Sequence, residues 1–519
     1  MNYTRRDVIA GSLALSAGSL LANAPLAATA TSAAEETNAR AAASKFFQPT
    51  WNSLRMLNTP QWLRDGKFGI YTHWGVYSVP AIGPNGTWYS NHLYMNPDSP
   101  ERIYHEATYG PLAKFGYKDF IPMFTGAKFN ADEWAELFQK AGARFAGPVA
   151  EHHDGFAMWD SQYTEWNAAK MGPKRDIVGE LAKSIKAHNM KFVTAFHHME
   201  NWYFFPTWDK SLDCGDPRYS GLYGPIHEKG AQPTKEFLDR WEGEVREVID
   251  KYGPDFIWFD FGLRAVPDVY KQDLLAYYFN KAAAENKEVV VSYKGHDLPP
   301  GVGIDDLELG QERDLTYHEW ITDSSVDNQG AWGYVKGAGF KTTENLVDNL
   351  VDRVSKNGYL LMNVGPKPDG TIPEVAQERL LGLGKWLQVN GEAIYGTTPW
   401  VIAAEGPTKL EKAGPFNEMD ALRYTAQDIR FTAKDNVLYA TALGWPGERT
   451  LIKSLAGGPN PDKNFWNGLY PSEIVSITML GDGRELKWEL TKEGLSVETP
   501  QTKPCEYAFV FKIVRKKPF

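Results

Sequence analysis

Short apolar runs alternate with amphipathic helical runs through most of this 519-residue chain, and this alternation constrains its fold more than any other feature. The apolar runs have the length of strands, and the helical runs repeat apolar residues every three or four positions. The predicted strands are 68–73, 145–149, 191–196, 256–259, 288–292 and 359–363, and the predicted helices are 131–141, 176–188, 234–251, 343–356 and 373–389. Repeated strand–helix units build parallel sheets, and this many predict a (β/α)8-like barrel. A doubly wound sheet is the alternative, but no glycine-rich phosphate turn follows any strand.

The sequence pattern changes after Tyr395, where short segments of alternating apolar and polar residues are separated by turn signals such as Gly481-Asp482-Gly483. This pattern predicts an antiparallel β-sandwich. The chain is thus expected to consist of a signal peptide, a linker, a (β/α)8-like catalytic domain and a β-sandwich domain, over residues 1–30, 31–50, 51–397 and 398–519 respectively. No later apolar stretch has the length needed to cross a bilayer, so membrane insertion is not expected.

The first thirty residues have the features of an export signal. Arg5-Arg6 precedes a mildly apolar run, and Ala28-Thr29-Ala30 has the small-x-small form of a cleavage site. The arginine pair indicates twin-arginine export, with an ordinary secretory leader as the alternative. Either route predicts a periplasmic or secreted protein.

Charge and cysteine content exclude several classes of function. The net charge of −10 and the pI of about 5.7 give no basic face for a nucleic acid partner. The two cysteines, Cys214 and Cys505, are too far apart in sequence for a metal knuckle or a redox pair, and they are either free or bridged. Neither the composition nor the motifs indicate an oligomeric state.

Polar residues follow four of the predicted strands. They are His73, the pair His152 and His153, His197 and Asp260. In a parallel barrel the carboxyl ends of the strands meet at one mouth, so these side chains are expected to converge there. Such a cluster fits either a catalytic metal or a polyhydroxylated ligand. Because adjacent residues of a strand point to opposite faces, His152 and His153 are not expected to bind one ion together, which disfavours the metal. Singly, each residue could instead be a hydrogen-bonded structural group.

Several motifs in order resemble the α-L-fucosidases of glycoside hydrolase family 29. They are FGIYTHWGVYSVPA (68–81), HHDGF (152–156), GPKRD (172–176), WFD (258–260) and NGYLLMNVGP (357–366) with Asp369-Gly370. The resemblance implies a (β/α)8-like barrel with a C-terminal β-sandwich, no metal or other cofactor, and hydrolysis of terminal α-L-fucose with retained anomeric configuration.

The resemblance also implies roles for individual residues. Asp260 matches the nucleophile, and the fucose contacts fall on His73, Trp88, His152, His153 and Trp258. We add His197 to the expected contacts because it follows a predicted strand. The acid/base is expected on a variable loop, 303–313. Glu308 is preferred because its surroundings resemble the motif Asp-x-Glu-Arg-Gly, with Leu309 in place of the arginine. Glu312 is the alternative, followed by Asp305 and Asp306.

Three further positions bear on specificity. Many relatives carry Glu where this chain has Thr87, so one charged contact to a sugar hydroxyl is expected to be absent. Lys294 falls near an arginine of some relatives and is expected either to contact a carboxylate or to be solvated. Trp332 resembles an aromatic that lines the apolar side of fucose, including its methyl group, although a packing role is the alternative.

The sequence therefore predicts a retaining exo-α-L-fucosidase that acts on fucosylated glycans or oligosaccharides. Two alternatives remain open. One is a non-catalytic carbohydrate-binding protein on the same fold. The other is a retaining glycosidase for a related sugar such as an α-L-galactoside.

Overall fold

The structure, a computed structural model, describes residues 46–418, 422–457 and 469–517. Residues 47–519 form one compact unit. The predicted signal peptide, 1–30, and the predicted linker up to residue 45 lie outside the described residues. Among the helices of the described residues, none is both long enough and apolar enough to cross a membrane.

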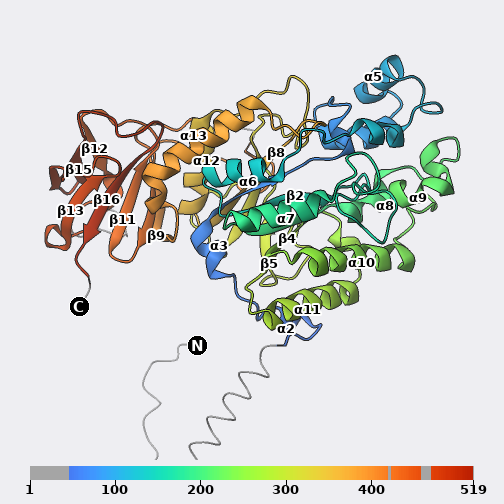
Figure 1. The fold of residues 1–519 in the computed structure, drawn as a ribbon. Coiled ribbons are helices and arrows are strands. Elements are labelled where there is room, and N and C mark those ends of the chain that lie inside the picture. The colour runs from blue at the N-terminus through green and yellow to red at the C-terminus, as the bar shows by residue number, and fades with distance from the viewer. Residues whose placement is uncertain (1–45, 419–421, 458–468, 518–519) are drawn as a thin grey trace, which may run out of the picture. The chain divides into compact units, whose positions relative to one another are not determined.

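Eight parallel strands close into a barrel, which confirms the predicted fold and excludes the doubly wound sheet (Figure 1). Each strand pairs with the next along the chain, and the first strand also pairs with the eighth. The strands are β1 (Phe68–Thr72), β2 (Phe145–Glu151), β3 (Lys191–Phe196), β4 (Phe256–Phe259), β5 (Val290–Tyr293), β6 (Ile304–Asp306), β7 (Trp320–Ser325) and β8 (Gly358–Val364).

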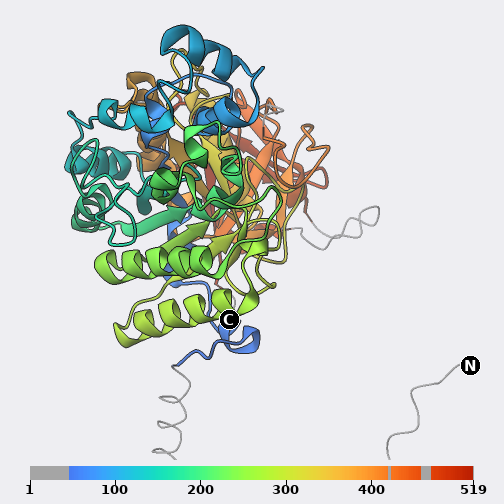
Figure 2. The same cartoon turned by 90° about the vertical axis from the view of Figure 1, so that its right-hand side faces the viewer.

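In the part of the chain that the structure describes, six long helices lie outside the ring of barrel strands. They are α6 (Ala131–Lys140), α7 (Ile177–Ala187), α10 (Lys235–Tyr252), α11 (Asp268–Ala284), α12 (Thr343–Ser355) and α13 (Glu374–Asn390). Neighbouring helices pack side by side, as Figures 1 and 2 show for α10 and α11. Shorter helices precede β1 or lie in the connections that follow β1 and β3: α2 (Trp51–Leu54), α3 (Gln61–Gly66), α4 (Tyr89–Met95), α5 (Pro100–Thr108), α8 (Asn201–Phe204) and α9 (Ser220–Tyr223).

Capping side chains set where several of these helices begin. Asn130, Asp176, Thr234 and Thr342 each precede a long helix and accept a hydrogen bond from a backbone N–H of its first turn. Such caps satisfy amides that the helix itself leaves without partners. This agreement between local sequence and structure explains why the predicted bounds of α6, α7, α10 and α12 are correct to within one or two residues.

The chain between β5 and β7 departs from the regular pattern. The described segments 294–303 and 307–319, which connect β5 to β6 and β6 to β7, contain no helix. The sequence did not predict β6 or β7 as strands, because they place Asp306, Asp323 and Ser324 at buried positions where apolar residues are expected. Residues 303–313, predicted as one loop, in fact begin with β6. Helix α11 was also missed, since the charged Lys271 lies on its buried face and the apolar Val269 is exposed, which weakens the helical repeat of apolar residues.

The C-terminal part consists of antiparallel sheets, as predicted. Its strands are β9 (Thr398–Glu405), β10 (Ile429–Lys434), β11 (Val437–Ala442), β12 (Arg449–Ile452), β13 (Ile474–Met479), β14 (Trp488–Leu490), β15 (Leu495–Glu498) and β16 (Phe509–Arg515). A five-stranded sheet in the order β13-β16-β11-β10-β9 and a three-stranded sheet in the order β12-β15-β14 share one apolar core, to which Phe431, Ile452 and Val497 contribute. Cys214 and Cys505 are free cysteines.

A buried ion pair joins α12 to β10. The Asp352 carboxylate accepts hydrogen bonds from Arg430 Nε at 2.6 Å and from Lys356 Nζ at 2.8 Å. Burial opposes ionisation of Asp352, but the two cations hold its pKa well below the ordinary value. All three side chains are almost completely inaccessible to solvent.

Replacing Asp352 with Asn is therefore expected to destabilise the protein strongly. The substitution leaves the Arg430 guanidinium buried without its counter-charge, which typically costs about 3–5 kcal/mol. Urea-induced unfolding followed by circular dichroism measures this loss. The exposed Glu378 on α13 provides a matched control, since Glu378→Gln should change the free energy of unfolding by less than about 0.5 kcal/mol. Equal effects of the two substitutions would contradict a stabilising role for the buried pair.

Candidate active site

A cavity of about 330 Å³ lies at the carboxyl ends of the barrel strands. Every residue predicted as nucleophile, preferred acid/base or sugar contact lines it. These residues are His73, Trp88, His152, His153, His197, Trp258, Asp260, Lys294, Glu308 and Trp332. The strands thus bring together side chains that are more than 250 positions apart in sequence.

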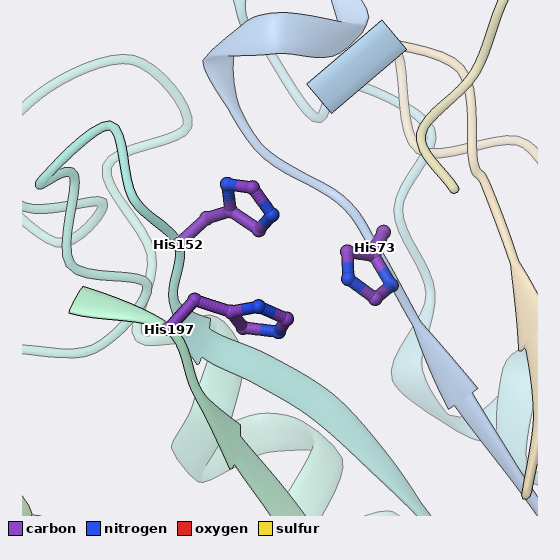
Figure 3. Close-up of side chains that lie close together, drawn as sticks. All are labelled: His73, His152 and His197. Atoms are coloured by element: carbon purple, nitrogen blue, oxygen red, sulfur yellow. The ribbon is translucent and has the colours of Figure 1, made fainter. Parts of the chain in front are cut away.

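Three histidines meet in this cavity from three neighbouring strands. His73, His152 and His197 each follow the last residue of β1, β2 and β3, and Figure 3 shows their rings turned toward a shared space. The Asn363 amide donates to the Trp332 carbonyl, so its oxygen faces His73 and accepts from Nδ1 at 2.8 Å. Burial holds the pKa of His73 well below its ordinary value, so the ring is neutral at neutral pH. Its Nε2 is therefore a hydrogen-bond acceptor.

The adjacent pair His152 and His153 contradicts one expectation. Both rings line the cavity, with centroids 4.2 Å apart, although residues of a regular strand would face opposite ways. The reason is that β2 ends at Glu151, after a register shift against β3, so both histidines lie beyond the strand. His153 Nδ1 donates to the His197 carbonyl at 2.9 Å. Burial lowers the pKa of His153 to about 4.

The cavity holds two residue sets that could bind a metal ion. The ligating atoms of His73, His152 and His197 lie within 4.8 Å of one another, as do those of His153, His197 and Asp260. Neutral imidazoles are ordinary ligands for transition metals, so the argument against a metal from opposite-facing histidines does not hold. The same nitrogens can also bind sugar hydroxyls, which need acceptors and donors at similar spacing.

Asp260 follows β4 and is held as a carboxylate. Its Oδ2 accepts a hydrogen bond from His197 Nδ1 at 2.7 Å, and its Oδ1 lies 3.3 Å from Lys294 Nζ. Burial opposes ionisation, but Lys294 and His197 hold the pKa of Asp260 well below its ordinary value. The result is an ionised oxygen, poor in hydrogen bonds, at the wall of the cavity, as a nucleophile requires.

Glu308 lies two residues after β6 and contacts the same lysine, Lys294. Its Oε2 is 2.7 Å from Lys294 Nζ, while Oδ1 of Asp260 is 3.3 Å from it. The two carboxylate oxygens can lie no farther apart than those two distances laid end to end, about 6 Å. Burial raises the pKa of Glu308 to about 7, although Lys294 lowers it. The two carboxyl groups therefore differ in protonation, Asp260 being ionised and Glu308 titrating near neutral pH.

The other acid/base candidates lie elsewhere. Glu312 does not line the cavity, and Asp305 lines a separate cavity beside β5 and β6. Asp306 is buried beneath Trp258, whose Nε1 donates to its Oδ2 at 2.6 Å. Of the candidates that the sequence offered, only Glu308 faces the same space as Asp260.

Lys294 is the cation around which these acids are arranged. Its side chain is 2% exposed, so of the two expectations for Lys294 the solvated lysine is wrong. It also lies 3.3 Å from Asp323 Oδ2, which accepts a hydrogen bond from Tyr71 at 2.9 Å. Burial alone would lower the pKa of Lys294, but Asp323, Glu308 and Asp260 hold it well above its ordinary value. The lysine is therefore charged.

Aromatic rings form the remaining walls. The backbone of Trp332 lies in the left-handed region at φ 56°. The centroid of its ring is 5.3 Å from that of the His73 ring and 5.9 Å from Lys294 Nζ. Trp88 lies 5.3 Å from the His153 ring. Thr87 lines the cavity and donates its hydroxyl hydrogen to Asn85 at 2.9 Å, so the position contributes no charge.

Sequence reasoning missed several lining residues. They are Asn85, Glu200, Phe261, Asp323 and Phe416. Glu200 comes four residues after β3, and burial raises its pKa to about 7. Phe261 directly follows Asp260, so its position was available from the WFD motif. Asp323 lies within an unrecognised strand, and Phe416 belongs to the C-terminal part, so no local pattern indicated either of them.

Comparisons with known proteins agree with this geometry. Residues 33–392 match the family model for α-L-fucosidase, and residues 423–514 match that for the α-L-fucosidase C-terminal domain. The tissue α-L-fucosidase of Rattus norvegicus is 32% identical over 90% of this chain and 93% of its own. The plasma α-L-fucosidase of Homo sapiens is 31% identical over 89% of this chain and 91% of its own.

A solved structure extends the likeness to three dimensions. The crystal structure of the Thermotoga maritima α-fucosidase in complex with fucose matches 90% of this chain and all of its own, with 32% identity and a TM-score of 0.71. Both family models, the relatives and the fold therefore agree over nearly all of the described residues. On this evidence, the chain belongs to the α-L-fucosidases of glycoside hydrolase family 29.

Proposed function

We propose that this protein hydrolyses terminal α-L-fucose from glycans or oligosaccharides by double displacement, with Asp260 as nucleophile and Glu308 as acid/base. One observation carries the proposal, namely that both carboxyl groups contact the Lys294 ammonium. Their separation of at most about 6 Å suits a retaining pair, whose carboxyls are ~5–5.5 Å apart, better than an inverting pair at ~6.5–9.5 Å.

In the first step the Asp260 carboxylate attacks the anomeric carbon, while Glu308 gives its proton to the departing glycosidic oxygen. A fucosyl ester of Asp260 forms and the leaving group departs as an alcohol. In the second step Glu308 removes a proton from water, which attacks the anomeric carbon and restores Asp260. The two inversions together retain the configuration.

The electrostatics of the pair support the change of role that Glu308 undergoes between the steps. The charge of Asp260 raises the pKa of Glu308, while Lys294 lowers it. When Asp260 becomes a neutral ester, its contribution is lost and that of Lys294 remains. The pKa of Glu308 must then fall, so the group that was an acid in the first step becomes a base for the second.

The side chains in the deep part of the cavity are suited to binding a sugar ring. The neutral rings of His73, His152 and His153 offer acceptors and donors to hydroxyl groups. Trp332 offers an apolar face beside them, suited to the C–H groups and the methyl group of fucose. An α-L-galactoside would present a hydroxymethyl group in place of that methyl group, so a panel of aryl glycosides distinguishes the two substrates.

We further propose that the chain is exported, since Arg5-Arg6 and the Ala28-Thr29-Ala30 site resemble a twin-arginine leader. Replacing both arginines with lysine should retain the enzyme in the cytoplasm of a bacterium that carries the twin-arginine translocase. Fucosidase activity in fractionated cells measures this. Unchanged periplasmic activity of the variant would indicate an ordinary secretory leader instead.

Replacing Asp260 with Gly is expected to lower the hydrolysis of an aryl α-L-fucoside by roughly 10⁴-fold or more, because no covalent intermediate can form. Added azide should restore turnover by entering the vacated space, and the product should be the fucosyl azide of opposite anomeric configuration. Product analysis by NMR decides the matter. Wild-type rates in this variant, or an azide product of retained configuration, would rule out Asp260 as the nucleophile.

The fall in activity at high pH, the basic limb of the pH profile, should arise from Glu308. Glu308 must be protonated for the first step, so kcat/KM is expected to fall as the pH rises through about 7. Glu308→Gln should abolish this basic limb and slow oligosaccharide hydrolysis by about 10²–10⁴-fold. Lys294→Met removes a charge that lowers the pKa of Glu308, so the limb should move to higher pH.

Two matched substitutions serve as controls for this profile. Glu312→Gln changes a neighbouring carboxyl group outside the cavity, and Glu200→Gln changes a second cavity carboxyl with a pKa of about 7. Both variants should keep the basic limb. Its loss in Glu200→Gln, together with its persistence in Glu308→Gln, would transfer the acid/base role to Glu200.

A further inference from the structure

The cavity has a closed, polar end and an open, apolar end. Lys294, Trp258 and His73 at the closed end are at most 2% exposed. At the open end, Phe416 is 56% exposed, although it is one of the residues that line the cavity. Phe416 is the most exposed of the lining residues, so the part of a substrate beyond the fucosyl ring can leave the cavity past it.

Phe416 comes from the C-terminal part of the chain, but it is fixed to the loop that carries Glu308. Its backbone N–H donates to the Glu308 carbonyl at 2.7 Å. On one side, Gly414 pairs with Gln311 in an isolated antiparallel bridge. On the other side, the backbone amides of Asn417 and Glu418 both donate to the Leu309 carbonyl. The Phe416 ring therefore has a defined position relative to the proposed acid/base.

The Glu418 side chain fixes the same segment to the barrel. Its buried carboxylate accepts hydrogen bonds from Ser324 Oγ at 2.9 Å, Lys341 Nζ at 3.0 Å and Asn349 Nδ2 at 2.6 Å. These partners come from β7, from the loop before α12 and from α12 itself. The segment is thus held at both the backbone and the side chain, and Phe416 is presented on a rigid support.

Phe416 itself has features that packing does not explain. Its backbone lies in the left-handed region at φ 58°, which is costly for a residue with a bulky side chain. Its large apolar ring remains mostly in solvent. The ring plane is within 17° of the Phe261 plane, with centroids 6.5 Å apart. Phe261 in turn follows the proposed nucleophile directly and has Lys294 Nζ 5.1 Å from its ring centroid.

We infer that Phe416, together with Phe261, forms the binding site for the first sugar of the leaving group, an apolar platform for one face of a pyranose ring. This inference rests on the proposed function. Glu308 must contact the glycosidic oxygen to protonate it, so the leaving sugar begins at Glu308. Phe416, whose side chain is exposed to solvent, is hydrogen-bonded to the Glu308 backbone carbonyl. The C–H face of a pyranose packs well on an exposed aromatic ring.

The test compares two substrates that differ only in the leaving group. One is a fucosylated oligosaccharide, whose leaving group is a pyranose, and the other is α-L-fucosyl fluoride, whose leaving group is a single atom. Phe416→Ala should lower kcat/KM for the oligosaccharide about three- to tenfold more than for the fluoride, mainly through KM. Phe416→Trp keeps an aromatic face and should retain most of the preference for the oligosaccharide.

Tyr317 provides the matched control, because it is a fully exposed aromatic residue on the loop between β6 and β7. Tyr317→Ala should change the rates for both substrates equally or leave them unaltered. If Phe416→Ala lowers kcat/KM for both substrates by the same factor, the platform is refuted. If the selective loss for the oligosaccharide instead appears in kcat, or the basic limb of the pH profile moves, Phe416 acts by positioning Glu308 and the platform is refuted as well, because fluoride departs with little need of an acid. If the wild-type enzyme hydrolyses neither substrate, the proposed function fails, and this outcome is distinct from a failure of the platform.

Discussion

The charge of one buried lysine organises the catalytic end of this barrel. The Lys294 ammonium, excluded from water, touches Asp260, Glu308 and Asp323, which come from the ends of β4 and β6 and from β7. An isolated buried cation would be very costly, and so would the carboxylates without it. Each group is therefore tolerable only because the others are present, and the geometry of the pair that lines the cavity, Asp260 and Glu308, follows from this mutual dependence.

The carboxyl groups do not share this cation equally. Asp260 receives a further hydrogen bond from His197, which holds it ionised. Burial leaves Glu308 with a pKa near 7, and burial together with the neighbouring Asp323 raises the pKa of Asp306 well above its ordinary value. One lysine thus contacts both an ionised group and a group that titrates near neutrality, while a third carboxyl group with a raised pKa, Asp306, is buried beneath Trp258. Differences in hydrogen bonding and burial, more than distance from the cation, separate their roles.

The sequence was most informative where function and fold use the same local pattern. The histidines and Asp260 follow apolar strands that the hydrophobic pattern of the sequence predicts. In a parallel barrel the carboxyl ends of these strands meet at one mouth. It failed at β6 and β7, where buried carboxyl and hydroxyl groups replace the apolar residues that identify a strand. It also could not find Phe416, because pairings between residues about a hundred positions apart, such as Gln311 with Gly414, bring this ring to the cavity. Interactions of this kind have no signature in local composition.

The missing helices between β5 and β7 give the C-terminal part a further importance. In a regular barrel a helix braces each loop from behind, but the loop that carries Glu308 is braced by residues 414–418 instead. The barrel and the C-terminal sheets are therefore separate in strand topology, but the C-terminal part contributes to the site at the mouth of the barrel. A barrel severed after residue 397 would keep Asp260 and its histidines while losing the segment that supports Glu308. An exchange of the sheets between relatives would have to include this segment to keep the contacts that hold Glu308.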